Sequence, residues 1–246
     1  MNMNIGLKNQ ERTIFSPKVF DLSRKFEFDH VETEQGKVII IDHFYKNFEA
    51  VQQEIQKIPI CELGTEEEIE NRGEKFFIGR RSHVIGMRGT VPPYREMVSR
   101  LVYNYFSLDR LNMNAAHTGD FLVNVFRKGK DFPEETHYCF VHRDPVKDAP
   151  RSMAIVVFLN SSYEEGEGFA VYKPKDETDF NAKYGTTIVP KKLVDVVSVI
   201  PAKPNRALLF EGDRIFHGQY TPTKQFYFED RLTQAIFVRL SYNTER

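Results

Sequence analysis

The stretch NRALLFEGDRIFHG, residues 205–218, contains the pattern on which the fold assignment depends. Its apolar run Ala207–Phe210 has the length of a short strand, Glu211-Gly212-Asp213 has the composition of a turn, and His217 follows. Runs of this kind recur after residue 115, separated by clusters of Gly, Pro, Asn and Asp. We expect strands at Phe121–Phe126, Met153–Leu159, Phe169–Tyr172, Leu193–Ile200, Ala207–Phe210 and Leu232–Leu240. Short strands with this spacing predict an all-β sandwich or barrel.

The first half of the chain is organised differently. Residues 1–36 are polar and mixed, which is typical of an irregular arm, whereas the β-branched run Val38–Ile41 predicts a strand. From Phe44 to Ile58 the apolar residues recur at three- and four-residue steps, as on one face of an amphipathic helix. A second such face follows Pro92-Pro93, and the acidic segment Cys61–Glu74 between the two predicted helices favours a loop.

The length of 246 residues fits one domain. We expect an N-terminal arm at 1–36 and a single domain at 37–246. That domain is expected to comprise a strand and helical lead segment at 37–114 and a β core at 115–246, so that the fold is mainly β with flanking helices.

Composition and charge disfavour several classes of protein. A formal net charge of −1 does not suggest the basic footprint of a nucleic-acid binder, although net charge leaves a local basic groove open. Cys61 and Cys139 are far apart and form no C-x-x-C pattern, which favours a reducing compartment such as the cytoplasm. Met1–Arg12 has no apolar segment of the secretory kind, and the longest apolar run, Met153–Leu159, is too short to cross a bilayer. We therefore expect no membrane partner.

The strongest chemical signal is His142-Arg143-Asp144. Residues i and i+2 of an extended segment point to the same side, so the imidazole and the carboxylate converge while Arg143 points away. His217 is the best candidate for a third ligand. Two histidines and one carboxylate on one face leave three adjacent positions of an octahedral metal open, as in non-haem Fe(II) oxygenases, where cosubstrate and O₂ bind side by side.

Other groups near this motif have more than one interpretation. Cys139 is either a packed thiol or a ligand, and His137 and His117 are competing imidazoles without a carboxylate two residues later. Asp213 either orients His217 by accepting from its second ring nitrogen or is simply a turn residue. The aromatic residues next to the ligands either form pocket walls or pack in the core; they are Tyr138, Phe140, Phe216 and Tyr220.

The C-terminal half resembles the double-stranded β-helix of the Fe(II)/2-oxoglutarate-dependent dioxygenases, a jelly-roll, cupin-like fold. It is most similar to their prolyl-hydroxylase-like branch. The front half also resembles the lead segment of that branch, in the run VIIIDHF that begins at Val38. The matching stretches occur in the family's order: His142-Arg143-Asp144, AIVVFLN (154–160), GEGFAVY (166–172), NRALLFEGDRIFHG (205–218) and RLTQAIF (231–237).

The resemblance implies Fe(II) as the metal, 2-oxoglutarate as the cosubstrate and O₂ as the oxidant. It implies that Arg231, which follows the distal histidine and opens a strand, pairs with the distal carboxylate of 2-oxoglutarate. Thr233 lies two residues further on the same face, and its hydroxyl can donate to that carboxylate. Asn124 either touches 2-oxoglutarate or makes an internal hydrogen bond. Arg239 and Lys224 are the alternatives to Arg231, one near the far end of the strand and one in a polar turn.

The implied activity is hydroxylation of an unactivated C–H bond, with succinate and CO₂ as coproducts. Halogenating members of the family have a small residue at the carboxylate position, so Asp144 favours hydroxylation or a related oxidation. The substrate class stays open between a small molecule, an amino acid and a peptidyl residue. The segment Glu177–Lys192 is a candidate lid over the pocket.

Two other functions remain open. A zinc-dependent hydrolase or lyase can use the same three ligands, but it gives no reason for the Arg231 and Thr233 pair. A jelly-roll binding module can keep the ligands without catalysis. Metal analysis together with a 2-oxoglutarate turnover assay separates these functions from that of an oxygenase.

Overall fold

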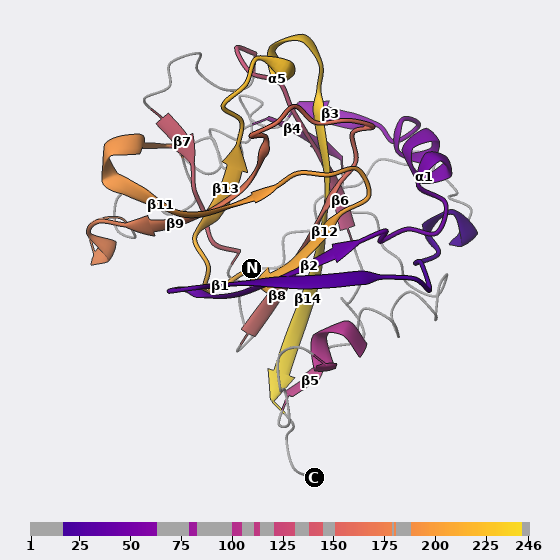
Figure 1. Cartoon of the computed structure of the whole chain (residues 1–246), viewed down its shortest axis with the longest axis horizontal. Coiled ribbons are helices and arrows are strands. Elements are labelled where there is room, and N and C mark those ends of the chain that lie inside the picture. Colours follow the sequence, from indigo (N-terminus) through magenta and orange to yellow (C-terminus); the bar gives the residue numbers. More distant parts are fainter. Residues whose placement is uncertain are drawn as a thin grey trace, which may run out of the picture.

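The structure is a computed structural model that describes residues 17–62, 79–82, 100–104, 111–113, 121–130, 138–144, 151–178, 180 and 188–242 (Figure 1). The strands are β1 (Glu27–Thr33), β2 (Gly36–Asp42), β3 (Ile60–Glu62), β4 (Arg80–Ser82), β5 (Leu111–Met113), β6 (Phe121–Phe126), β7 (Tyr138–Phe140), β8 (Arg151–Phe158), β9 (Gly168–Pro174), β10 (Ile188–Pro190), β11 (Val194–Pro201), β12 (Ala207–Glu211), β13 (His217–Tyr220) and β14 (Arg231–Tyr242). The helices are α1 (Phe48–Ile55), α5 (Gln225–Phe228) and two short 3-10 helices, η1 (Pro17–Phe20) and η2 (Lys191–Leu193).

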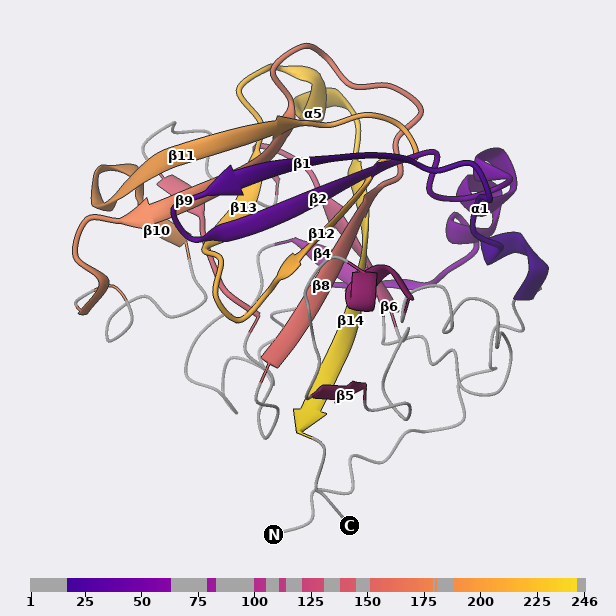
Figure 2. The ribbon, with the colours of Figure 1, turned by 60° about the horizontal axis from the view of Figure 1, so that its bottom comes forward.

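The strands form two layers. The large sheet has the order β1-β2-β12-β8-β14-β6-β4-β3, with β5 paired to β14. The second layer contains the strands β11-β9-β13. An isolated bridge between His142 and His217 joins β13, at the edge of this layer, to the segment that follows β7. Strand β7 pairs with β10. Figure 2 shows β8 and β14 side by side, with β9 and β11 as a second pair at an angle to them.

The chain passes back and forth between the layers after residue 138. Strands β8, β12 and β14 lie in the large sheet, whereas β7, β9, β11 and β13 lie in the second layer. The central order β12-β8-β14-β6 therefore faces β11-β9-β13-β7, which is the arrangement of a double-stranded β-helix. This confirms the predicted mainly-β jelly roll, and it confirms the six strands predicted after residue 115.

Successive side chains of each strand point to opposite faces of the sheet, and this alternation divides the apolar core into layers. On β8, Met153, Ile155 and Val157 pack in the cluster that also contains Val51 and Ile55 of α1.

The neighbouring residues Ala154 and Phe158 pack between the two sheets, with Phe169 and Val171 of β9. Thr233 of β14 is paired with Phe158, so Thr233 and Arg231 face the space between the sheets. Gln234 points the other way, where its Oε1 accepts from the hydroxyl of Tyr45 at 2.5 Å.

Helix α1 is shorter than the predicted Phe44–Ile58. His43 has a φ of 57°, a left-handed conformation that ends β2, and Phe44 N–H donates to Asn205 O at 2.9 Å. The helix begins only after Asn47, whose side chain caps it by accepting from Ala50 N–H. The apolar spacing identified the correct face, but a long-range backbone contact fixed the first residue.

Strand β1 lies in the segment 1–36 that we expected to be irregular, so that expectation is wrong for residues 27–33. It pairs with β2 over seven residues from Glu27↔Asp42 to Thr33↔Gly36, although its sequence EFDHVET is polar and exposed. An edge strand gains its backbone hydrogen bonds from its neighbour, so an apolar face is not required. The division into an arm at 1–36 and a domain at 37–246 stays a prediction.

The other expectations for the lead segment fall mostly outside the described residues. Residues 100–104 of the second predicted helix are helical, with Leu101 and Val102 buried. Within the candidate lid, residues 188–190 pair with β7 as strand β10. Among the helices of the described residues, none is both long and apolar enough to cross a membrane.

A buried ion pair fastens the start of the lead segment to the β core. Arg206 donates to both carboxylate oxygens of Asp42, at 2.6 and 2.7 Å, and the two side chains are only 8% and 21% exposed. The hydrogen bonds from Arg206 hold the pKa of Asp42 below its ordinary value of 3.8. Above pH 3.8 the pair therefore stabilises the folded state, and this contribution is lost as the pH falls through the lowered pKa.

We expect Asp42→Asn to reduce the free energy of unfolding at pH 7 by about 1 to 3 kcal/mol, because it leaves a buried guanidinium without its counterion. Urea unfolding at several pH values measures this loss, which should shrink below about pH 4. The matched control is Asp195→Asn, which removes an exposed pair with Lys175 and should change the stability very little. An equal loss in both variants would contradict the prediction.

Candidate metal centre

His142 and His217 meet through backbone pairing. The N–H of each residue donates to the carbonyl of the other at 2.9 Å, which forms an antiparallel bridge between the segment after β7 and the start of β13. Residues opposite each other in such a bridge carry their side chains on the same face. The ring centroids consequently lie 4.2 Å apart. Two imidazoles that are far apart along the chain are therefore neighbours in the fold.

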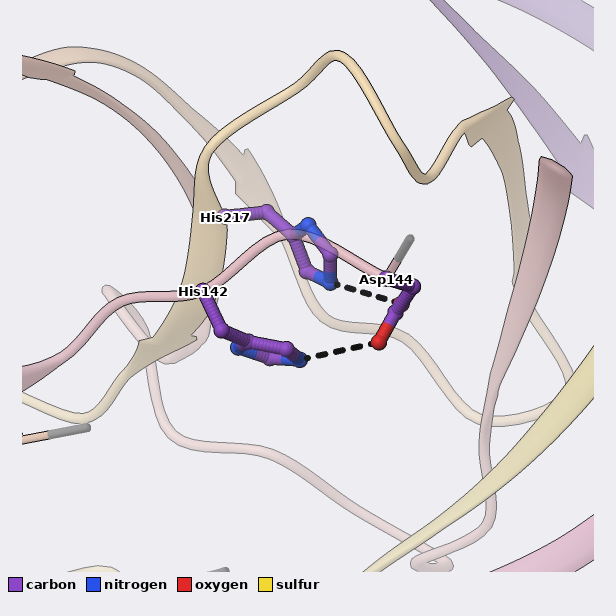
Figure 3. A group of neighbouring side chains, drawn as sticks. All are labelled: His142, Asp144 and His217. Carbon is purple, nitrogen blue, oxygen red and sulfur yellow. Dashed lines mark ion pairs between the residues drawn. The ribbon is translucent and has the colours of Figure 1, made fainter. Parts of the chain in front are cut away.

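Asp144 completes the cluster. Figure 3 shows both imidazoles directed at its carboxylate, with His142 Nε2 at 3.6 Å from Oδ1 and His217 Nε2 at 3.3 Å from Oδ2. One donor atom from each of the three residues lies within 4.8 Å of the others. Ligands at right angles, each about 2.1 Å from a metal, lie about 3 Å apart. The three donors therefore fit one face of a single ion and leave the opposite face to other ligands.

Backbone contacts fix the position of the carboxylate. Asp144 N–H donates to Gly212 O at 2.6 Å, and the hydroxyl of Ser152 donates to Asp144 O at 2.6 Å. A Cβ on Gly212 would lie 3.1 Å from Cβ of Asp144 and 3.2 Å from Cβ of Ala154, so the close approach depends on glycine. The turn after β12 thus holds the second ligand in place.

The ring of His217 is oriented by its own chain. Its Nδ1 lies 2.9 Å from Ile215 O, which directs Nε2 toward Asp144. Hydrogen bonds of this kind commonly set the tautomer of a metal-binding histidine. The orienting role considered for Asp213 is wrong, because its carboxylate accepts from Ser152 N–H at 3.3 Å; Asp213 is a residue of the turn.

The electrostatics favour the ligating forms at neutral pH. Burial disfavours a charged imidazole and, together with the nearby His217, lowers the pKa of His142 to about 3. Burial alone would raise the pKa of Asp144, but the two imidazoles beside it lower that pKa below 3.8 overall. A neutral imidazole and an ionised carboxylate are the forms that bind a metal.

Aromatic rings enclose the two imidazoles. Phe169 stacks on His217 with centroids 5.3 Å apart, and Phe140 lies 4.4 Å from His142. Among the aromatic residues flanking the motifs, Phe140 is therefore beside the centre. Phe216 and Tyr220 pack in or against a separate apolar cluster, so of the two interpretations core packing applies to them. Phe169 lies in a predicted strand, but no motif in the sequence marks it as a neighbour of a metal ligand.

The β1–β2 hairpin also supports the distal ligand. Gln35 Oε1 accepts from Phe216 N–H at 2.8 Å, immediately before His217, and Gly36 lies against Ile215. No local pattern in the sequence indicates this contact, which joins residues 181 positions apart.

Arg231 lies in the same space between the sheets as the three ligands. It is 4% exposed, and its Nη2 donates to Gly168 O at 2.8 Å. Its guanidinium lies over the rings of Phe158 and Phe226, at 5.6 and 5.9 Å from their centroids. Nε is buried without a hydrogen-bond partner. Glu167 interacts electrostatically with the guanidinium, but no ion pair within 4.0 Å joins Arg231 to a carboxylate of the described residues. A buried guanidinium without a close ion pair is costly, and binding an anion beside it would offset that cost.

Thr233 and Asn124 are directly opposite each other on β14 and β6. Their side chains therefore share the inner face with Arg231. Oδ1 of Asn124 is buried and has no hydrogen-bond partner among the described residues, so the internal hydrogen bond considered for this residue is not made by that atom.

The remaining candidates do not join this cluster within the described part of the chain. Lys224 is exposed and precedes α5. The backbone of Arg239 is paired with Ser152, and its side chain lies outside the described residues. His30 and His43 have side chains 53% and 64% exposed. Six more histidine, tyrosine and cysteine residues lie, wholly or by their side chains, outside the described residues: His83, His117, His137, Tyr138, Cys61 and Cys139.

Substitution of Gly218 tests whether the metal centre depends on the close approach of β13 to the segment that carries His142. An added Cβ would overlap the carbonyl oxygen of Phe140, a backbone atom that cannot move without separating β13 from the segment that carries His142. We expect Gly218→Ala to lower the free energy of unfolding by about 3 kcal/mol or more, measured by urea unfolding. Gly212→Ala meets only side-chain atoms, so its loss of stability should be smaller. Equal stability of Gly218→Ala and the wild type would contradict the proposed packing.

No protein-family model matches the sequence, and no curated protein matches it. Solved structures do match. A prolyl-4-hydroxylase from Pseudomonas putida is 13% identical, with 85% of this chain and 88% of that chain covered and a TM-score of 0.41. An oxidoreductase of the 2OG-Fe(II) oxygenase family from Burkholderia pseudomallei is 13% identical, with coverages of 82% and 84% and a TM-score of 0.41.

The epimerase SnoN from nogalamycin biosynthesis, solved with Fe³⁺ and α-ketoglutarate, is 11% identical, with coverages of 83% and 80% and a TM-score of 0.48. The matching structures thus include one named as a 2OG-Fe(II) oxygenase and one named as a prolyl-4-hydroxylase.

Proposed function

We propose that this chain is an Fe(II)- and 2-oxoglutarate-dependent dioxygenase in which His142, Asp144 and His217 hold the metal. One observation carries the proposal: the three donors converge from one side, and Arg231 lies on the same inner surface, buried and with its Nε unpaired among the described residues. Two histidines and a carboxylate on one face of a metal are typical of iron oxygenases that bind cosubstrate and O₂ on the other.

The spacing of Arg231 from the ligands supports a dicarboxylate cosubstrate. Arg231 contacts Gly168, three residues before Val171, and Val171 is the strand partner of His217. Three residues of β-strand span about 10 Å. That distance suits a short dicarboxylate with one end at the metal and the other paired to the guanidinium.

Thr233 and Asn124 flank the same position. We propose that the Thr233 hydroxyl and the Asn124 amide nitrogen donate to the distal carboxylate beside Arg231. Thr233 is only 8% exposed and lies two residues from Arg231 on the same face. Three donors on rigid strands would fix both the position and the orientation of the cosubstrate.

The bound iron and 2-oxoglutarate would supply the oxidation of a C–H bond by O₂, with succinate and CO₂ as coproducts. The chain itself binds, orients and shields. Ile215 O holds the ring of His217, and Gly212 O holds the backbone of Asp144. Phe169 and Phe140 cover the imidazoles and reduce the access of water to the centre.

The presence of Asp144 supports hydroxylation or a related oxidation rather than halogenation. Its carboxylate lies between the two imidazoles and occupies the third position on the metal-binding face. We propose a small molecule, an amino acid or a peptidyl residue as the substrate.

A zinc hydrolase or lyase would use the same three ligands, yet it would not need a buried guanidinium on the same inner surface. A binding module without catalytic activity would need neither the three metal ligands nor the buried guanidinium. The burial of Arg231 on the inner surface favours the oxygenase over both of these functions.

The deciding experiment loads the purified chain anaerobically with Fe(II), adds 2-oxoglutarate, admits O₂ and measures succinate. Parallel samples contain Zn(II) or lack O₂. We expect succinate only with Fe(II) and O₂, at a slow rate without substrate. Tight Zn(II) binding without any succinate would favour the hydrolase, and weak binding of both metals would favour the binding module.

A further inference from the structure

Gln219 lies beside the metal centre but is not one of its three ligands. It is on β13 two residues after His217, so the two side chains share a face. Its partner on β9 is Phe169, whose ring stacks on His217. On the other side of β13, the isolated bridge between His142 and His217 brings in the segment after β7, where the Phe140 ring lies 4.4 Å from that of His142.

The amide of Gln219 therefore lies beside the Phe169 ring, on the face of β13 that also carries His217. The two imidazoles lie on the same surface. A polar group next to apolar rings is the pattern of a binding site in which a few polar atoms set the orientation of the ligand.

The side-chain oxygen of Gln219 has no partner in the described residues. Oε1 is buried, and neither Phe169 nor Phe140 offers it an O–H or N–H donor. The hydrogen bond from Tyr172 goes to the backbone oxygen of Gln219, at 3.2 Å, and leaves the side chain unused. Buried polar atoms in folded proteins are nearly always hydrogen-bonded, so this acceptor requires a donor from elsewhere.

We propose that the Gln219 amide oxygen accepts a hydrogen bond from a hydroxyl or N–H group of the molecule that is oxidised. The proposal rests on the function proposed above and narrows its substrate class. At neutral pH, 2-oxoglutarate carries only acceptors, so it cannot satisfy this oxygen. The substrate is thus a polar compound with a donor close to the oxidised carbon, and hydrocarbon-like molecules without donors are poor substrates.

The test uses the Fe(II)-loaded full chain and pairs of carboxylic acids that differ in one group. The 2-amino and 2-hydroxy acids carry a donor, whereas the corresponding unsubstituted acids do not. The rise in succinate release on adding each compound is measured. We expect a rise only with donor-bearing members. An equal response to both members of the pairs, whether both stimulate or neither does, overturns the proposal.

Gln219→Met keeps the length of the side chain and removes its hydrogen bonding. One hydrogen bond is worth about 1 kcal/mol, so we expect kcat/KM for the best donor-bearing compound to fall about 5- to 10-fold. The KM for 2-oxoglutarate should change much less than this. The matched control is Gln53→Met, at an exposed position of α1, which should have no effect.

Gln219→Glu distinguishes the substrate from 2-oxoglutarate as the hydrogen-bond partner of the Gln219 amide. A carboxylate still accepts from a substrate donor, so the preference for donor-bearing compounds should persist. If the amide nitrogen instead donates to 2-oxoglutarate, Gln219→Glu raises the KM for that cosubstrate by repulsion, and the proposal is overturned. Failure of the wild type to release any succinate, with or without substrate, refutes the oxygenase itself and is seen before any Gln219 variant is measured.

Discussion

Asp144→Ala is expected to abolish succinate release and to lower metal affinity by more than about 100-fold. Loss of a residue that only orients a ligand typically costs 10- to 100-fold, and loss of the ligand should cost more. The fold should survive, because the Asp144 side chain is 21% exposed and the contacts of its backbone with Gly212 and Ser152 do not involve the carboxylate. Mn(II) titration followed by paramagnetic resonance measures the affinity, and circular dichroism checks the fold. His142→Ala should behave in the same way.

The matched control is Asp213→Ala. Asp213 is a carboxylate in the adjoining turn, and its contact is the N–H of Ser152 rather than either imidazole. We expect its metal affinity and its succinate release to stay within a few-fold of the wild type. Retained activity in Asp144→Ala, or equal losses in both variants, would show that the ligand is another group.

The second large effect is expected for Arg231→Ala, which should raise the KM for 2-oxoglutarate about 10- to 100-fold. A hydrogen bond to a charged group contributes about 1.5 to 3 kcal/mol, and a bidentate pair also fixes the orientation of the bound carboxylate. Succinate release at increasing cosubstrate concentration measures the change. Binding of Mn(II) without cosubstrate should be unaffected, because Arg231 contacts none of the three ligands among the interactions described.

Two variants separate charge from geometry at this position. Arg231→Lys keeps the charge but lacks the planar fork, so we expect an intermediate KM. Lys224→Ala removes an exposed cation from the polar turn and should leave the KM unchanged. An unchanged KM in Arg231→Ala would move the role to Arg239 or Lys224. Because Arg231 is 4% exposed, urea unfolding of each variant must accompany the kinetics.

Much of the architecture was predictable because the sequence pattern of a strand is local. Runs such as Phe121–Phe126 and Ala207–Phe210 are bounded by turn residues, and their alternation divides side chains between two faces. The same two-residue period placed His142 beside Asp144 and Arg231 beside Thr233 on the inner face. Helix α1 was predicted from its period, whereas its first residue was not, because the left-handed His43 and the hydrogen bond from Phe44 N–H to Asn205 O separate the helix from the preceding strand.

The exposed strand β1 and the support that Gln35 gives to the distal ligand left no signal in the sequence. Each depends on a contact with another segment of the chain, and a local sequence pattern does not reveal such a contact. The same holds for Ile215 as the group that orients His217, in place of Asp213, since both lie in one turn and only the folded backbone selects between them.

The sequence by itself determined the ligand types, their order and the face on which each strand presents them, because strand period and side-chain chemistry are local properties. Only the tertiary structure decided that two imidazoles and a carboxylate meet, that Nε of Arg231 is buried and unpaired among the described residues, and that Gln219 has an unused acceptor beside the Phe169 ring. These are properties of the space between two sheets. The pairing of strands distant in the chain sets that space, through backbone contacts as close as the one between Gly218 and Phe140.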